Sequence, residues 1–166
     1  ELKSALDKFV DMLGFIGWKE HISLILSAGA YVNKPGAHKL GIAFDLDGII
    51  LNDGTIYTAL KAPDKLYWRI GAILGQIFGV LLHREYNTLH RDHFHIDLGQ
   101  PVEWRNSTSQ AQLVQAILVH IFDKELEIDG KIGHNSIEAW CEALGKDHIN
   151  QTSDFIELMK RASAGS

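Results

Sequence analysis

The apolar positions in the first hundred residues predict a mixture of helices and short strands. Apolar side chains from Leu2 to Leu13 recur at the spacing of one face of an amphipathic helix, and Gly14 follows as its end. Short apolar runs bounded by turn residues predict strands, two of which form a hairpin around an Asn-Asp-Gly turn. The predicted elements are strands at 22–26, 41–51, 55–58, 79–82 and 93–98, and a helix at 64–78 with Asp64 as its N-cap.

After Pro101 the pattern becomes helical. An apolar stripe from Leu113 to Phe122 has helical spacing, and a last helix is expected around 153–161. Residues 1–106 carry 11 basic and 12 acidic side chains, whereas residues 107–166 carry 5 and 9. The expected N-caps are Ser107 (with Gln110) and Asn135 (with Glu138).

We therefore expect an α+β fold in two parts. Residues 1–106 form a domain in which a small antiparallel sheet with flanking helices carries the functional site, and residues 107–166 form a small helical module.

Composition narrows the class of protein. The chain has 166 residues, of which 46% are hydrophobic and 22% charged, so a disordered chain is excluded. The single Cys141 cannot form an internal disulfide. The net charge of −5 without clustered Lys or Arg argues against nucleic-acid binding. No apolar run approaches the ~20 residues that a membrane span needs, so no span is expected.

Histidine is the unusual residue, because four of the nine fall within thirteen positions. They are His83, His90, His93 and His95. Residues two apart in a strand share a face, so His93 and His95 point the same way and Phe94 points into the core.

A second group of metal-binding residue types lies near the 41–51 strand. His38 precedes this strand and Asp45 lies on it. Pairing of residues 41–46 with 93–98 would bring His38, Asp45 and His95 together. Three nitrogen and oxygen ligands with a fourth position open are typical of a catalytic zinc site.

Two alternatives stay open at this stage. An iron oxygenase site also uses two histidines and one carboxylate, and His95 with Asp97 has the H-x-D spacing of such sites. That arrangement would leave Asp45 without a role. Asp47, on the same strand face as Asp45, is a weaker rival ligand.

Two sequence blocks resemble known zinc peptidases. His38-Lys-Leu-Gly-Ile-Ala-Phe-Asp45 resembles the H-x-x-G-x-A-x-D motif of the group that contains lysostaphin, D-Ala-D-Ala carboxypeptidases and the sonic hedgehog N-domain. Phe78-Gly-Val-Leu-Leu82 and His90-Arg-Asp-His-Phe-His-Ile-Asp-Leu98 are similar to the closing block of the extensin-like C-terminal domain within that group.

The resemblance implies a role for each matching residue. His38, Asp45 and His95 match the zinc ligands. Asp92 matches the position of a catalytic acid/base carboxylate, and His93 the first histidine of the H-x-H motif. Either could move the proton of the attacking water, and His93 could instead stabilise the developing oxyanion.

Two departures concern substrate binding. Many relatives have an Arg in the loop before the first ligand, where this chain offers Lys34, and Gly36 stands where they have Ser. We assign Lys34 and His90 to substrate binding or to support of the ligands. Whether the cleaved bond is internal or C-terminal is left open.

The C-terminal part carries a resemblance of its own. Asp129-Gly-Lys-Ile-Gly-His-Asn-Ser-Ile-Glu-Ala139 resembles the D-G-x-x-G-x-x-T-x-x-A signature of helical peptidoglycan-binding domains, and His134 and Trp140 are its candidate contact residues. The alternative is a helical appendage that only stabilises the first domain, because Asp-Gly also suits a plain turn.

Together the resemblances imply a zinc metallopeptidase that hydrolyses peptide bonds of bacterial peptidoglycan or its stem peptides. Its expected location is the cell envelope, periplasmic or extracellular, and a phage-encoded origin is compatible with this. The alternative is a non-catalytic cell-wall or metal-binding module that retains the peptidase fold.

Overall fold

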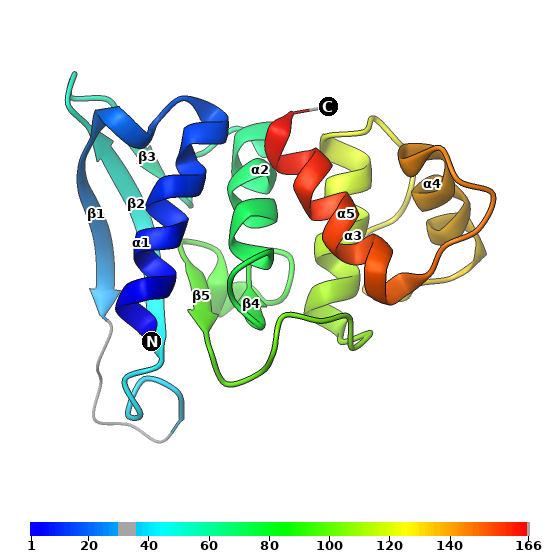
Figure 1. Ribbon diagram of the computed structural model, residues 1–166, viewed down its shortest axis with the longest axis horizontal. Coiled ribbons are helices and arrows are strands. Elements are labelled where there is room, and N and C mark those ends of the chain that lie inside the picture. The colour runs from blue at the N-terminus through cyan, green and yellow to red at the C-terminus, as the bar shows by residue number, and fades with distance from the viewer. Residues whose placement is uncertain (30–35, 166) are drawn as a thin grey trace.

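The computed structural model describes residues 1–29 and 36–165 and shows an α+β fold. Among the described residues, two α-helices and all five strands lie in the first part, and only helices follow residue 107 (Figure 1). The strands are β1 (Ile22–Gly29), β2 (Ala43–Leu51), β3 (Ile56–Thr58), β4 (Val80–Leu82) and β5 (Phe94–Asp97). The helices are α1 (Leu2–Met12), α2 (Asp64–Gly75), α3 (Thr108–His120), α4 (His134–Leu144) and α5 (Gln151–Ala164).

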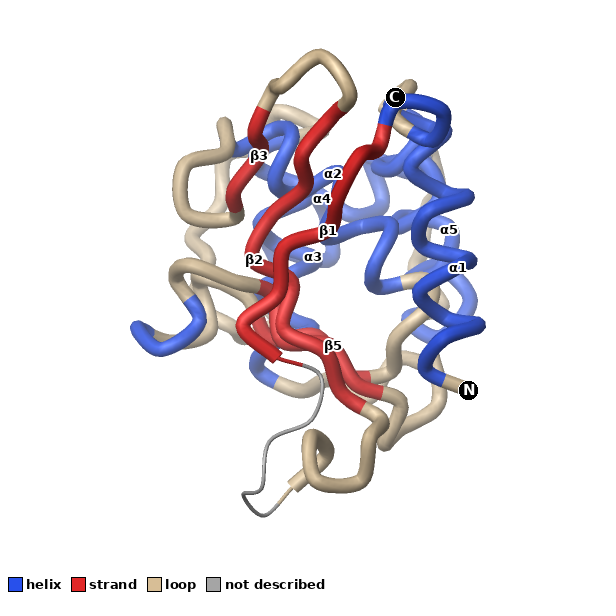
Figure 2. Tube along the Cα trace, turned by 90° about the vertical axis from the view of Figure 1, so that its left-hand side faces the viewer, coloured by secondary structure: helices blue, strands red, loops and turns tan. Residues whose placement is uncertain are grey.

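The strands form one antiparallel sheet in the order β1-β2-β5-β4, with β3 also paired to β2. The predicted pairing of the 41–46 and 93–98 segments is confirmed, and it sets Asp45 opposite His95. In Figure 2 helix α2 lies behind the strands and α1 lies to their right, and neither helix passes in front of the strands. Cross-strand partners of β2 and β5 can therefore direct their side chains to the same face of the sheet.

Strand β2 has a bulge at Asp47, between Leu46 and Gly48. Leu26 faces Gly48 and Ser27 faces Leu46, so Asp47 has no partner in the β1 register. Leu46 and Ile49, three apart, are consequently both buried, which strict alternation would forbid.

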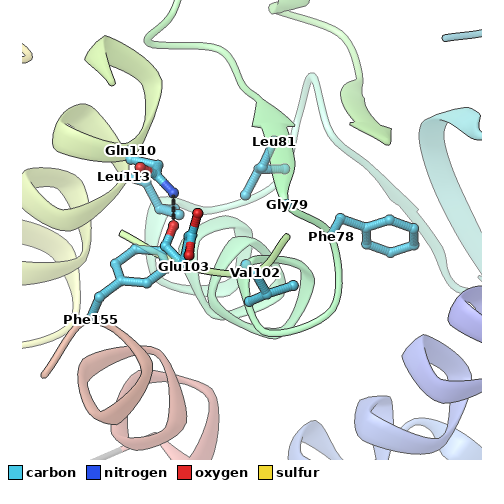
Figure 3. Close-up of a pocket in the computed structure, with 9 residues that line it drawn as sticks. Phe78, Gly79, Leu81, Val102, Glu103, Gln110, Leu113 and Phe155 are labelled. Atoms are coloured by element: carbon cyan, nitrogen blue, oxygen red, sulfur yellow. Dashed lines mark hydrogen bonds between the residues drawn. The ribbon is translucent and has the colours of Figure 1, made fainter. Parts of the chain in front are cut away.

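The C-terminal helices share their core with the first part of the chain. Helix α5 lies beside α2 (Figure 1), and Gln76 donates hydrogen bonds to the Met159 carbonyl and to the Ser163 hydroxyl. Leu81 from the first part lines a small cavity together with Leu113 of α3 and Phe155 of α5 (Figure 3). The buried apolar residues of both parts form one cluster. Whether residues 107–166 also act as a unit of their own stays a prediction.

The sequence predicted N-caps for three helices, and the structure confirms one of them. The expected cap at Ser107 is confirmed, because its hydroxyl accepts from the Gln110 amide. The other two expected caps are wrong. Pro63 caps α2, and Asp64 is instead its first residue, paired with Arg84. Gly133 caps α4, so Asn135 lies inside that helix.

His83 proves to be a core residue. It is fully buried, its Nε2 is 2.8 Å from the Ser109 carbonyl oxygen, and its Nδ1 has no partner. Burial lowers the pKa of His83 to about 4. The neutral ring therefore joins the end of β4 to the start of α3.

One prediction concerns the shared core. Met159→Asp places a charge against Gly75 of α2 and should destabilise the protein by on the order of 4 kcal/mol. If the core is shared, residues 1–106 unfold in the same transition as the C-terminal helices, which thermal unfolding monitored by near-UV circular dichroism would show. Lys160→Asp, on the exposed side of the same helix, is the control and should have a small effect. Two separate transitions would show independent units.

A second prediction concerns acid stability. Because the folded pKa of His83 lies below the ordinary 6.5, the unfolded chain takes up this proton first. The contribution of His83 is complete above about pH 6.5 and is lost as the pH falls toward 4. At about 1.4 kcal/mol per pKa unit, this removes roughly 2–3 kcal/mol between pH 7 and pH 4.5.

His83→Gln should flatten this pH dependence by that amount, measured as free energy of unfolding in urea at both pH values. The exposed His148→Gln is the control. Equal pH dependence in wild type and His83→Gln would contradict the assignment.

Candidate metal centre

Three side chains meet where β2 and β5 pair. Asp45 and His95 are cross-strand partners, so their side chains leave the sheet on the same face. His38 comes from a turn between Gly36 and Gly41 that precedes β2. The structure therefore brings together the three residues that the sequence predicted as ligands.

The three ligand atoms form a compact triangle. His38 Nε2 lies 3.1 Å from His95 Nδ1 and 3.2 Å from Asp45 Oδ1. His95 Nδ1 lies 2.9 Å from the same oxygen. Ligand bonds of about 2.1 Å at tetrahedral angles separate ligand atoms by about 3.4 Å. The cluster could therefore hold a metal ion with little movement.

Burial and charge both act on this cluster. The side chains of His38 and Asp45 are 7% and 14% exposed. Burial alone would raise the pKa of Asp45, but the hydrogen bond with His95 and the nearby histidines leave this pKa below its ordinary value. Burial opposes a charged His95, yet hydrogen bonds to Asp45 and Asp97 raise the pKa of His95 to about 9. A cation in the triangle would take the place of that proton.

Asp97 lies behind His95 rather than in the triangle. Its Oδ2 is 3.2 Å from His95 Nε2, the ring nitrogen that points away from Asp45, and its Oδ1 accepts from the Gly99 amide. A carboxylate in this place fixes the ring so that Nδ1 faces a metal. The alternative in which His95 and Asp97 bind the same iron is therefore not supported by the geometry.

Asp47 is also outside the triangle. Burial, together with the charges of Asp45 and Asp92, raises the pKa of Asp47, although His93 acts in the opposite direction. Among the described residues, only the triangle meets the distance criterion for a metal cluster. The structure therefore gives no support to Asp47 as a ligand.

His93 stands beside the triangle and Asp92 stands behind His93. His93 Nε2 lies 3.9 Å from Asp45 Oδ1, and His93 Nδ1 lies 2.8 Å from Asp92 Oδ1. The His93 side chain is 18% exposed and the Asp92 side chain 67%. The hydrogen bond to His93 lowers the pKa of Asp92. The carboxylate is thus ionised, and the imidazole lies between it and Asp45.

A pocket opens over the triangle. Its wall includes His90 and His93, and Leu82 and Leu89 supply apolar surface. His90 Nδ1 lies 2.7 Å from Asn87 Oδ1, and the same oxygen accepts from the Leu89 amide. Asn87 was not predicted from the sequence. Its position three residues before His90 was the available signal, but Asn is common at such turns.

Lys34, expected to bind substrate, lies outside the described residues. His90 does line the pocket, so a contact with substrate agrees with its position.

The C-terminal signature forms a turn held by a buried glutamine. Gln115 Nε2 donates to Asp129 Oδ1, to the Lys131 carbonyl and to the Ser136 hydroxyl, while Gln115 Oε1 accepts from the Gly130 amide. Gly130 has φ 75°, and a Cβ there would lie 2.8 Å from the Thr108 side chain. These contacts explain the Asp, Gly and Ser of the signature by packing.

The two contact residues suggested there differ in exposure. His134 is exposed and lines a shallow groove with Asp129 and Lys131. Trp140 is fully buried, with its ring 5.6 Å from that of Trp104. A ligand on the surface of this module could therefore contact His134 but not Trp140.

None of the described helices is long and apolar enough to cross a membrane, as the sequence predicted.

Comparison with known proteins bears on the segment that carries the site. No significant match to the chain was found among curated proteins or among solved structures. Residues 27–107 match the family model described as extensin-like protein C-terminus. This range contains every residue of the triangle and of the pocket wall described above. The extensin-like resemblance of this part of the chain is therefore confirmed.

Proposed function

We propose that the protein is a zinc-dependent peptidase that hydrolyses peptide bonds of bacterial peptidoglycan or of its stem peptides. The observation that carries this proposal is the triangle of His38, Asp45 and His95, open to a pocket that also contains His93. Two imidazoles and one carboxylate suit zinc, and three protein ligands leave a position for water or substrate. A structural zinc site would be closed by a fourth protein ligand.

The surrounding residues support hydrolysis. Bound zinc would polarise the scissile carbonyl and lower the pKa of a water molecule to about 7. His93 lies close enough to the triangle to exchange a proton there, with Asp92 behind it. Proton transfer by such a group typically contributes about 10²–10⁴-fold in rate.

The substrate class rests on the two sequence resemblances. The H-x-x-G-x-A-x-D and H-x-H motifs resemble those of cell-wall peptidases, and the Asp129–Ala139 signature resembles that of peptidoglycan-binding domains. Both resemblances concern the same polymer, and this supports a location in the cell envelope. His90 and the apolar Leu82 and Leu89 would contact the peptide beside the cleaved bond.

We predict that the protein binds about one zinc ion and that the triangle holds it. His38→Ala, Asp45→Ala and His95→Ala should each weaken zinc binding by more than about 100-fold, because loss of an outer partner alone typically weakens it 10–100-fold. Competition with a chromogenic chelator measures the affinity. The exposed His148→Ala is the matched control and should bind zinc as the wild type does. Wild-type affinity in all three triangle variants would exclude this site.

We also predict that zinc-loaded protein releases peptide fragments from purified peptidoglycan, identified by mass spectrometry. Activity should be lost with a chelator and restored by zinc. Full zinc occupancy without any product would instead support the non-catalytic module. Activity that requires oxygen and iron would support the oxygenase.

A further inference from the structure

Two histidines of the pocket are each tied through Nδ1 to the side chain of a residue that precedes them. His93 is bonded to Asp92 and His90 to Asn87, at 2.8 Å and 2.7 Å. An imidazole held through Nδ1 keeps Nε2 for other partners. The two pairs differ in charge, because Asp92 is a carboxylate and Asn87 a neutral amide.

Asp92 and His93 differ in their position relative to the pocket. The His93 ring lines the pocket, with Nε2 3.9 Å from Asp45 Oδ1. The Asp92 side chain is 67% exposed and is not part of the pocket wall. The ring lies between Asp92 and the triangle. A water molecule at the triangle would therefore be closer to His93 than to Asp92.

The chemistry of the pair fixes the tautomer. An ionised carboxylate only accepts hydrogen bonds, so His93 Nδ1 must carry the proton in this contact. In the neutral ring Nε2 then has a lone pair, and this nitrogen is the one that lies 3.9 Å from Asp45 Oδ1. A group that must take a proton from water needs this form.

We propose that Asp92 is a positioning residue, which holds His93 in the Nδ1–H tautomer, and that His93 Nε2 is the atom that moves the proton. This rests on the proposed function and deepens it, because the resemblance would make Asp92 itself the acid/base. During hydrolysis Nε2 takes one proton from the attacking water and delivers it to the amine nitrogen. The C–N bond breaks and the hydroxyl stays on the carbonyl carbon. Asp92 stays ionised and stabilises the charged ring between these two transfers.

The first test needs no activity. Nitrogen-15 spectra of histidine rings in the zinc-loaded protein report which nitrogen carries the proton. We expect His93 as the Nδ1–H tautomer in the wild type and a shift toward a mixture in Asp92→Ala. Asn87→Ala is the matched control and should change His90 while leaving His93 as it was. An Nε2–H tautomer in the wild type, or a His93 signal that ignores Asp92→Ala, overturns the proposal.

The second test is a double-mutant cycle on kcat and KM for a soluble stem peptide. Asp92→Ala should lower kcat by about 10–100-fold with little change in KM, as loss of an outer partner does. His93→Ala should lower kcat by about 10²–10⁴-fold. If Asp92 acts through His93, the double variant is no slower than His93→Ala alone. If the two losses multiply, Asp92 acts on the substrate directly and the proposal is wrong.

The two tests separate this inference from the proposed function. A wild type without turnover on any stem peptide contradicts the peptidase, and the ring spectra then decide the Asp92–His93 pair alone. A wild type that turns over but shows multiplicative losses keeps the peptidase and removes the positioning role.

Discussion

The antiparallel pairing of β2 with β5 is the constraint on which the site depends. It sets Asp45 opposite His95 and Leu46 opposite Phe94, so one row faces the open side and the next faces the helices. A shift of the register by one residue in either strand would move the site residues of that strand to the face that is buried in the core. The register is fixed by burial, because Leu46, Phe94 and Ile96 are nearly or fully inaccessible. The packing of one face thus positions the chemistry of the other.

The sequence predicted this part well because its signals are local or periodic. The period of two placed His93 and His95 on one face, and short apolar runs located the strands within a few residues. His38 and Asp45 could be joined to them only by assuming the strand pairing, which the resemblance supported. The bulge at Asp47 had no comparable signal, since it depends on how β1 meets β2.

The C-terminal helices show what periodicity leaves open. An apolar stripe predicts that a helix face is buried, but not which surface buries it. Met159 and Leu158 pack into a core that includes α2, and Arg69 of α2 donates to the Ser163 carbonyl near the end of α5. The caps expected at Asp64 and Asn135 failed for a similar reason. Short polar residues signal a helix start only to within a residue or two, and the tertiary contacts of each helix decide the rest.

Three imidazoles of the pocket have one feature in common, because one ring nitrogen of each lies within hydrogen-bond distance of a side-chain oxygen. His95 has Asp97, His93 has Asp92 and His90 has Asn87. The charge of that oxygen sets what each ring can do. A carboxylate behind a metal ligand strengthens it as a donor, and a carboxylate behind a free ring makes it a better base. A neutral amide orients its ring without making it more basic. Under the proposed function, the difference between Asp92 and Asn87 is therefore the feature that would separate a proton-transfer histidine from a substrate-contacting one in the same pocket.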